Sequence, residues 1–351
     1  MENCQNGNHL YRRSEMKYRK IGNSGLITSS LTLGTMIFGE ESNRSTPKQE
    51  ALRIIDRYLD AGGNHLDTAD VYAGGRSEDI VGESLKARRS DVIISTKLRF
   101  RTQGNINTEG LSRWNIYHGV HASLRRLQTD YIDLLYIHCI DPITPLEETI
   151  RALDDLIKDG KVRYIGISNF KAWQLMKAQG LTSTLNTNPF IAAQYQYSLV
   201  KRDIEYEYFD LFESEGFGLL PWGPLGGGFL TGKYSKDRPV SGRIATTPSD
   251  SEESWERRNS DKNWEIIEKL HQLSEKYQAT PSQLSIAWIL SNHIVSSVIL
   301  GVRTYEQLTD NLGAIDISLE SNDQADLNKV SALPELYPYR MIEQYSKRDL
   351  T

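Results

Sequence analysis

The sequence has little of several features that mark particular protein classes. It contains only two cysteines, Cys4 and Cys139, so neither a disulfide framework nor a cysteine metal site is indicated, and a reducing cytoplasmic compartment fits. No apolar run approaches the ~18 residues that a membrane-spanning helix requires. Lys and Arg (41) do not outnumber Asp and Glu (46), so no basic surplus attracts nucleic acid. We expect no metal, no membrane partner and no nucleic-acid partner.

The first sixteen residues are polar and lack the apolar centre of a secretory leader. We expect residues 1–16 to form a disordered tail, and truncation of Met1–Glu15 to leave fold and activity intact. The remaining residues, 17–351, are enough for one large domain, because α/β barrels often use a chain of this length as a single domain.

Short β-branched or apolar runs alternate with longer helical patterns along most of the chain. This alternation is typical of parallel strands joined by helices, and eight strands suit closure of the sheet. We therefore predict an α/β fold, a (β/α)8 TIM barrel. The predicted strands are Ser29–Thr35, His65–Thr68, Asp91–Lys97, Asp133–His138, Val162–Ser168, Phe190–Gln194, Gly216–Trp222 and Ser296–Gly301.

Two further patterns complete the predicted fold. Lys17–Ile27 is predicted to form a β-hairpin around a turn at 23–25, placed to cover the bottom of the barrel. Three predicted helices begin with the same Thr-Pro-x-Glu/Gln pattern, at Thr46, Thr144 and Thr280. In each, threonine is expected to cap the helix and proline to occupy its first turn.

Three segments interrupt the alternation: Arg99–Arg113, the longer Tyr234–Asn263, and a C-terminal extension, Leu333–Thr351. Loops of this length in a compact domain are usually functional or disordered, so we expect them to set substrate choice. Four aromatic residues have two open interpretations, an apolar substrate pocket or ordinary packing. They are Phe38, Phe100, Trp114 and Tyr195.

In such barrels the active site lies where the strands end, at the start of the βα loops. Each polar residue at these positions has an ordinary explanation when taken alone: a solvated lysine, a core histidine, an aspartate that caps a helix. Their joint occurrence on one face of the barrel favours an active site. The residues are Asp67, Tyr72, Lys97, His138, Ser168, Asn169, Gln194, Trp222 and Arg303.

Six segments along almost the whole barrel resemble the aldo-keto reductase superfamily. They are LDTADVY (Leu66–Tyr72), ISTK (Ile94–Lys97), DLLYIHCID (Asp133–Asp141), GKVRYIGISNF (Gly160–Phe170), WGPLGGGFLTGKY (Trp222–Tyr234) and GVRTYEQLTDN (Gly301–Asn311). Trp222, where many members carry Tyr, and the motif after Gly301 resemble the branch with potassium-channel beta subunits and their bacterial relatives. Any one segment is weak, but six in family order are highly specific.

The resemblance implies a catalytic tetrad of Asp67, Tyr72, Lys97 and His138 that reduces a small-molecule carbonyl compound to an alcohol. Tyr72 would donate the proton that the carbonyl oxygen needs. An ammonium ~4 Å from a phenolate interacts with it by about 4 kcal/mol at an effective dielectric of ~20, roughly three pKa units. We therefore expect Lys97 to lower the pKa of Tyr72, Asp67 to orient Lys97, and neutral His138 to position the carbonyl group.

Hydride must come from a cofactor, since no side chain supplies it. A Rossmann fingerprint is absent, and Gly227–Lys233 matches a P-loop except that Tyr234 stands where Ser or Thr is needed. The resemblance implies NADPH, with Arg303 at the 2′-phosphate favouring it over NADH. The resemblance also implies that Lys233 contacts the pyrophosphate, that Trp222 stacks on the nicotinamide ring, and that Ser168, Asn169 and Gln194 hold the carboxamide. Further implied cofactor contacts are Gly34, Thr35, Met36, Asp67, Gly223, Pro224, Leu225, Gly226, Gly301, Gln307, Asp310 and Asn311.

Two other functions stay open. A Schiff-base aldolase would use Lys97 as nucleophile, but it leaves Trp222, Arg303 and Gln307 without a role. A cofactor sensor would bind NADPH tightly, turn over slowly and signal to a partner that no feature of the sequence identifies. A sugar, a simple aldehyde and a larger ketone all remain candidate substrates, and the sequence is silent on physiological direction and oligomeric state.

Overall fold

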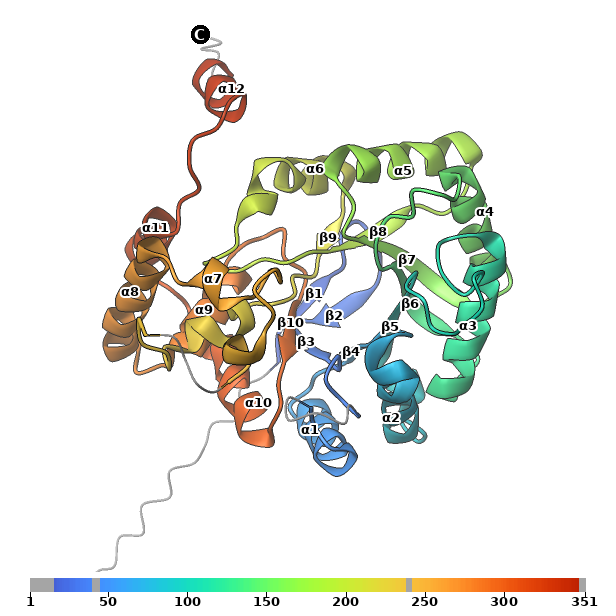
Figure 1. Ribbon diagram of the computed structural model, residues 1–351, viewed down its shortest axis with the longest axis horizontal. Helices are drawn as coiled ribbons and strands as arrows, with labels where there is room; N and C mark the ends of the chain where they lie inside the picture. Colours follow the sequence, from blue (N-terminus) through green and yellow to red (C-terminus); the bar gives the residue numbers. More distant parts are fainter. Residues whose placement is uncertain (1–15, 40–44, 238–241, 347–351) are drawn as a thin grey trace, which may run out of the picture.

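A computed structural model of the chain describes residues 16–39, 45–237 and 242–346. It contains an antiparallel hairpin and one parallel sheet of eight strands in the order β10-β3-β4-β5-β6-β7-β8-β9 (Figure 1). The strands are β1 Tyr18–Lys20, β2 Ile27–Ser29, β3 Leu31–Gly34, β4 His65–Asp67, β5 Ile93–Leu98, β6 Ile132–Ile137, β7 Val162–Ser168, β8 Phe190–Gln194, β9 Gly218–Leu219 and β10 Val298–Gly301. Helices surround the sheet.

The two ends of the sheet meet, which closes the barrel. Leu219 of β9 forms a parallel bridge with Val295, just before β10, and the Ile299 N–H donates to the carbonyl of Pro221 at 2.9 Å. The predicted (β/α)8 barrel is confirmed. The helices are α1 Lys48–Asp60, α2 Arg76–Ser84, α3 Arg113–Leu127, α4 Leu146–Lys158, α5 Ala172–Leu185, α6 Tyr208–Glu215, α7 Trp255–Arg258, α8 Asp261–Tyr277, α9 Pro281–Leu290, α10 Tyr305–Leu312, α11 Ser321–Val330 and α12 Tyr339–Tyr345.

Four of the predicted strands, those that correspond to β4, β5, β6 and β10, differ from the observed bounds by one or two residues at one or both ends, and two others differ more. Ser29–Thr35 is wrong as a single strand, because Ser29 ends hairpin strand β2 and the N–H of Ser30 turns to the carbonyl of Lys17 at 2.7 Å before β3 begins. Gly216–Trp222 is wrong as a full strand, since only two residues of it pair regularly. Pro221 has no N–H with which to continue the ladder towards β10.

The predicted N-terminal hairpin is confirmed, and it lies against one end of the barrel. Gly22, with φ +52°, lies so close to the segment before β9 that a Cβ there would be 2.3 Å from the carbonyl oxygen of Gly216. The N–H of Asn23 donates to the same oxygen at 2.8 Å. Only glycine fits this approach, so the hairpin turn covers the bottom of the barrel.

One of the three predicted threonine caps is present. The Thr280 hydroxyl accepts a hydrogen bond from the third N–H of α9 at 3.2 Å, as predicted. The other two predictions are wrong: α1 and α4 begin after the proline and have no side-chain cap. The Thr46 hydroxyl donates to the carbonyl of Arg303 at 3.1 Å, and that of Thr144 donates to Asp141 at 2.6 Å. Both hydroxyls therefore donate hydrogen bonds outside the helices that the local pattern predicts them to cap.

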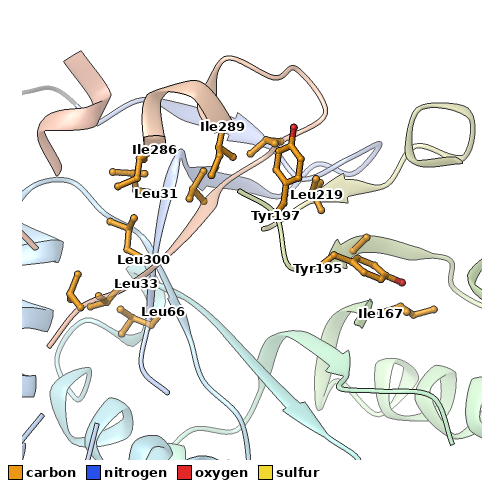
Figure 2. Packing of buried hydrophobic residues seen from close by; sticks show 14 of the residues in the cluster. Leu31, Leu33, Leu66, Ile167, Tyr195, Tyr197, Leu219, Ile286, Ile289 and Leu300 are labelled. Carbon is orange, nitrogen blue, oxygen red and sulfur yellow. The ribbon is translucent and has the colours of Figure 1, made fainter. Parts of the chain in front are cut away.

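Alternation along the strands separates the packing outside the barrel from the side chains inside it. Leu31 of β3 and Leu300 of β10 pack on the side of Ile286 and Ile289 of α9, and Leu33 lies beside Leu66 of β4 (Figure 2); all are fully buried. Each contributes ~1.5–3 kcal/mol by its burial. The residues that alternate with these leucines therefore face the barrel interior.

The two chain ends differ from each other in the structure. Of the predicted tail, 1–15 lies outside the described residues, whereas Met16 is buried in the core. At the other end, α12 lies away from the barrel (Figure 1), and its large apolar side chains are exposed. Among the described residues, no helix combines the length and the apolar character needed to cross a bilayer.

Candidate active site

Asp67 and Lys97 form an ion pair inside the barrel. They lie at the ends of neighbouring strands β4 and β5, and Lys97 Nζ donates to Asp67 Oδ1 at 2.5 Å and to the carbonyl of Thr68 at 2.7 Å. Lys97 is completely buried and Asp67 is 3% exposed. Two charges at this depth remain charged only because they are paired and hydrogen bonded.

Tyr72 and His138 stand beside this pair. Tyr72 begins a short 3-10 turn after β4 in which Ala73 has φ +50°, a left-handed conformation that is unusual for a residue with a Cβ. Lys97 Nζ lies 4.9 Å from the centre of the Tyr72 ring, and the His138 ring meets Tyr72 edge-on at 5.8 Å. The structure therefore brings together the phenol, ammonium, carboxylate and imidazole that the sequence placed on one face.

Two opposing influences act on the pKa of Tyr72. Burial is the largest influence and raises the pKa of Tyr72, and the opposing effect of Lys97 does not reverse it. The predicted lowering by Lys97 is therefore present, but desolvation of the phenolate outweighs its attraction to the ammonium, so the net pKa of Tyr72 is raised in the protein alone. Burial lowers the pKa of Lys97, but Asp67 and Tyr72 together turn the net change upwards, so the ammonium persists.

His138 is neutral. Burial, followed by the Lys97 charge, lowers its pKa to about 3. Its Nδ1 is buried and has no hydrogen-bond partner among the described residues, and the Phe100 ring packs edge-on against the imidazole at 4.8 Å. A neutral imidazole in this position can offer one N–H to a carbonyl oxygen without carrying charge.

The second carboxylate oxygen of Asp67 accepts two hydrogen bonds. Ser95 Oγ donates to Oδ2 at 2.7 Å, and Gln194 Nε2 donates to the same atom at 2.9 Å. The family resemblance implies a cofactor contact for Gln194, and the sequence motifs do not single out Ser95. Alternation could have identified Ser95, since it stands two residues before Lys97 and therefore on the same face of β5.

Ser168 and Asn169 lie at the end of β7, next to His138. Asn169 has φ +54°, and its Nδ2 donates to the carbonyl of His138 at 2.8 Å and to Ser168 Oγ at 2.9 Å. Ser168 Oγ in turn donates to the carbonyl of Gln194 at 2.7 Å. These contacts fix the two side chains beside the tetrad.

The segment after Trp222 leads into a tight 3-10 turn, Gly226–Thr231, which packs against α9. Gly223, Gly226, Gly227 and Gly228 all have φ between +57° and +92°, which only glycine adopts without strain. Pro224 and Leu225 lie within this turn. A Cβ on Gly228 would lie 3.8 Å from the ammonium of Lys233. At Gly223, Gly226 and Gly227 the side chains of Glu253 and Val200 occupy the space that a Cβ would need, so glycine lets the loop pack closely against its own neighbours.

An ion pair between an exposed arginine and a buried glutamate, which no sequence pattern indicates, supports this loop. Arg243 Nη2 and Glu253 Oε2 are 2.6 Å apart, and Glu253 is buried. The Glu253 side chain lies under the loop, so that a Cβ on Gly227 would be 3.1 Å from its Cβ. Both residues belong to Tyr234–Asn263, where no periodic pattern indicates which side chains turn inwards.

The residues after β10 lie around the beginning of α10. The side chain of Gln307 accepts a hydrogen bond from the N–H of Arg303 at 2.8 Å, and Asp310 accepts from the Thr280 hydroxyl at 3.1 Å. Asn311 is buried, whereas Gly301 has open space where a Cβ would stand. Gln307 therefore fixes the backbone at Arg303 by a hydrogen bond.

The end of β3 contributes one exposed side chain. Gly34 pairs with Asp67 of β4, and a Cβ on it would lie 2.8 Å from the Ile299 side chain. Thr35 is buried, and its hydroxyl donates to the carbonyl of Asp67 at 3.0 Å. Met36 is 40% exposed. Of these residues, Thr35 has its hydroxyl engaged within the barrel and Met36 has its side chain available at the rim.

The four aromatic residues separate into two groups. Phe38 and Tyr195 are buried in the core outside the barrel, which favours packing for both. Trp114 is half exposed and stacks on His118 at 5.0 Å. Phe100, against His138, is the member that contacts the tetrad.

Comparison with known proteins gives consistent matches over nearly the whole chain. Residues 30–332 match the family model described as Aldo/keto reductase family. Proteins named probable voltage-gated potassium channel subunit beta are 37% identical in Arabidopsis thaliana, over 86% of this chain and 92% of the relative, and 37% identical in Oryza sativa subsp. japonica, with the same coverage. A putative subunit of the same name in Schizosaccharomyces pombe is 34% identical, over 87% of this chain and 90% of the relative.

Proposed function

The chain belongs to the aldo/keto reductase family, and on that premise we propose that it is an NADPH-dependent oxidoreductase that reduces an aldehyde or ketone to an alcohol. The observation that supports this most is the arrangement of Tyr72, Lys97 and His138 around one point at the end of the barrel. A phenol, an ammonium and a neutral imidazole together suit proton transfer to a carbonyl oxygen.

The residues around this point fit NADPH. The left-handed glycines from Gly223 to Gly228 let the chain turn tightly, and Gly228 lies close to the Lys233 ammonium that a pyrophosphate would contact. Burial lowers the pKa of Lys233, and the positive charge of Arg303 lowers it further, so an anionic phosphate would relieve the repulsion between the two cations. Trp222, half-buried, packs against the apolar cluster that includes Tyr136 and Leu220, and it offers a flat ring there. When bound, NADPH supplies the hydride.

The chain's own residues would handle the proton and the charge. His138, which is neutral, donates an N–H to the carbonyl oxygen and positions it. Tyr72 gives its hydroxyl proton to that oxygen as negative charge develops there. Lys97, held in the charged form by Asp67, stabilises the phenolate that remains. In the reverse direction the same phenolate accepts the alcohol proton, so oxidation of an alcohol requires Tyr72 to be ionised.

Steady-state oxidation of NADPH with a panel of carbonyl compounds tests this proposal. The panel should include a sugar aldehyde, a simple aldehyde and a polycyclic ketone, because the residues at the site do not choose among them. Turnover that is lost in Tyr72→Phe supports the reductase. A protein that binds NADPH but reduces no member of the panel contradicts it.

The names of the relatives favour a second candidate function. They are voltage-gated potassium channel beta subunits, so this chain is also a candidate NADPH sensor that turns over slowly and reports the cofactor to a partner. Tight NADPH binding without turnover would favour the sensor. The Schiff-base aldolase fits less well, because its lysine must lose a proton and the net pKa of Lys97 is raised.

A further inference from the structure

A row of buried hydrogen bonds leads from Asp67 towards the bottom of the barrel. Ser95 Oγ, which donates to Asp67 Oδ2, lies 2.9 Å from His65 Nε2. The other ring nitrogen of the imidazole, Nδ1, lies 3.0 Å from Thr28 Oγ1. Thr28, His65 and Ser95 are all completely buried, and they stand on β2, β4 and β5. The row thus links the hairpin under the barrel to the tetrad.

Only one assignment of donors and acceptors satisfies every hydrogen bond in this row. A serine hydroxyl has a single proton, and at Ser95 it goes to the Asp67 carboxylate, which can only accept. The Ser95 oxygen must therefore accept from His65, which requires the proton of the neutral imidazole on Nε2. His65 Nδ1 is then an acceptor, and the Thr28 hydroxyl, which also lies 3.2 Å from the carbonyl of Ser29, donates its single proton to the nearer ring nitrogen. Burial lowers the pKa of His65 to about 4, which agrees with a neutral ring.

The barrel interior does not need polar side chains at this depth. The other side of the interior is filled by an apolar cluster that includes Leu134, Ile191 and Leu220. Apolar side chains would fill the space of His65 and Ser95 without the cost of desolvating three polar atoms. Each of those atoms is instead hydrogen bonded within a row that ends on Asp67. We therefore interpret the row as a support for the Asp67 carboxylate.

We propose that His65 and Ser95 are positioning residues, which hold the Asp67 carboxylate turned towards Lys97 and so set the acidity of Tyr72. The catalytic consequence rests on the proposed function, whereas the direction of the hydrogen bonds does not. Without the Ser95 donor, Gln194 alone would bond Asp67 Oδ2. The carboxylate would carry more uncompensated negative charge, which raises the pKa of Tyr72 and opposes formation of the phenolate.

The charged and titratable groups around this row are few. His65 interacts with Asp67 and Lys97, and the Tyr58 hydroxyl from α1 bonds its backbone. Tyr72 interacts with Lys97, Asp67 and Asp70. A change at Ser95 therefore reaches Tyr72 through the Asp67–Lys97 pair, and the pH dependence of turnover can report it.

The experiment compares Ser95→Ala with a matched control, Ser297→Ala. Ser297 is equally buried and its hydroxyl bonds Thr32 at 2.7 Å, but that bond does not involve the tetrad. Two variants of His65 complete the set: His65→Leu removes the donor, and His65→Gln keeps an N–H at a similar reach. Nitrogen NMR of the protein without cofactor reports the His65 tautomer and the Lys97 ammonium, and kinetics report alcohol oxidation with NADP⁺ against pH.

The proposal predicts a proton on His65 Nε2, and a Lys97 ammonium resonance that moves in Ser95→Ala but not in Ser297→Ala. Ser95→Ala and His65→Leu should lower kcat about tenfold and move its pH midpoint upwards, with the Kd for NADPH unchanged and His65→Gln close to wild type. A proton on Nδ1, an unmoved Lys97 resonance, or kcat losses equal to those of Ser297→Ala would overturn it. If the wild-type protein reduces no carbonyl, the proposed function fails and the two NMR results still decide the proposal.

Discussion

The Asp67–Lys97 pair makes a quantitative prediction for Lys97→Met. Methionine keeps most of the side-chain volume but removes the only ammonium that Asp67 Oδ1 contacts at hydrogen-bonding distance among the described residues. Asp67, only 3% exposed, would then be a buried carboxylate with two neutral donors, Ser95 and Gln194. Removing one partner of a buried pair costs about 3–5 kcal/mol of unfolding free energy.

The same substitution should change catalysis by an amount that follows from the distance. If the phenolate charge is placed at the centre of the Tyr72 ring, 4.9 Å from Lys97 Nζ, the attraction is about 3 kcal/mol at an effective dielectric of ~20. That corresponds to a rise of roughly two pKa units for Tyr72. Alcohol oxidation near neutral pH should therefore slow about a hundredfold, and its pH midpoint should move upwards.

Urea unfolding and the pH dependence of kcat measure the two effects. The control is the double variant Asp67→Asn with Lys97→Met, which removes both charges and should recover most of the lost stability while remaining inactive. A single variant as stable as wild type, or one with the wild-type pH midpoint, would refute the reasoning about the pair.

Three other predictions concern single side chains. Tyr72→Phe should lower turnover by orders of magnitude while the Kd for NADPH, measured by fluorescence, stays the same; full activity would remove Tyr72 from the mechanism. Arg303→Ala should weaken NADPH much more than NADH in the same assay, and equal losses would refute the 2′-phosphate assignment. Burial, followed by the charge of Glu78, raises the pKa of Asp70 from 3.8 to about 8, so the carboxyl destabilises the fold increasingly as pH rises through that window. Asp70→Asn should therefore gain stability relative to wild type between those pH values in urea unfolding, and a constant difference would contradict the shift.

The parts of the fold and site that the sequence predicts are those that local patterns determine. The strands Val162–Ser168 and Phe190–Gln194 have the predicted bounds, because an apolar run bounded by turn residues defines them. The strand ends at Asp67 and Lys97 bring the two charges together, because parallel strands of a barrel end on one face.

The parts that were missed depend on tertiary neighbours. The Thr46 hydroxyl bonds the distant carbonyl of Arg303, so a local capping rule does not apply. The raised pKa of Tyr72 depends on how completely the ring is desolvated, which spacing does not reveal. His65 and Ser95 alternate with Asp67 and Lys97, so their direction was predictable, but their hydrogen-bond partners required the register of β4 on β5.

The most direct test of the central claim is transfer of deuterium from NADPH labelled at the reactive C4 position to a carbonyl substrate, followed by mass spectrometry. The arrangement of Tyr72, Lys97 and His138 predicts an alcohol with one deuterium on the former carbonyl carbon, formed by the wild-type protein and lost in Tyr72→Phe. An unlabelled alcohol, or labelled alcohol formed equally fast by Tyr72→Phe, would contradict the claim.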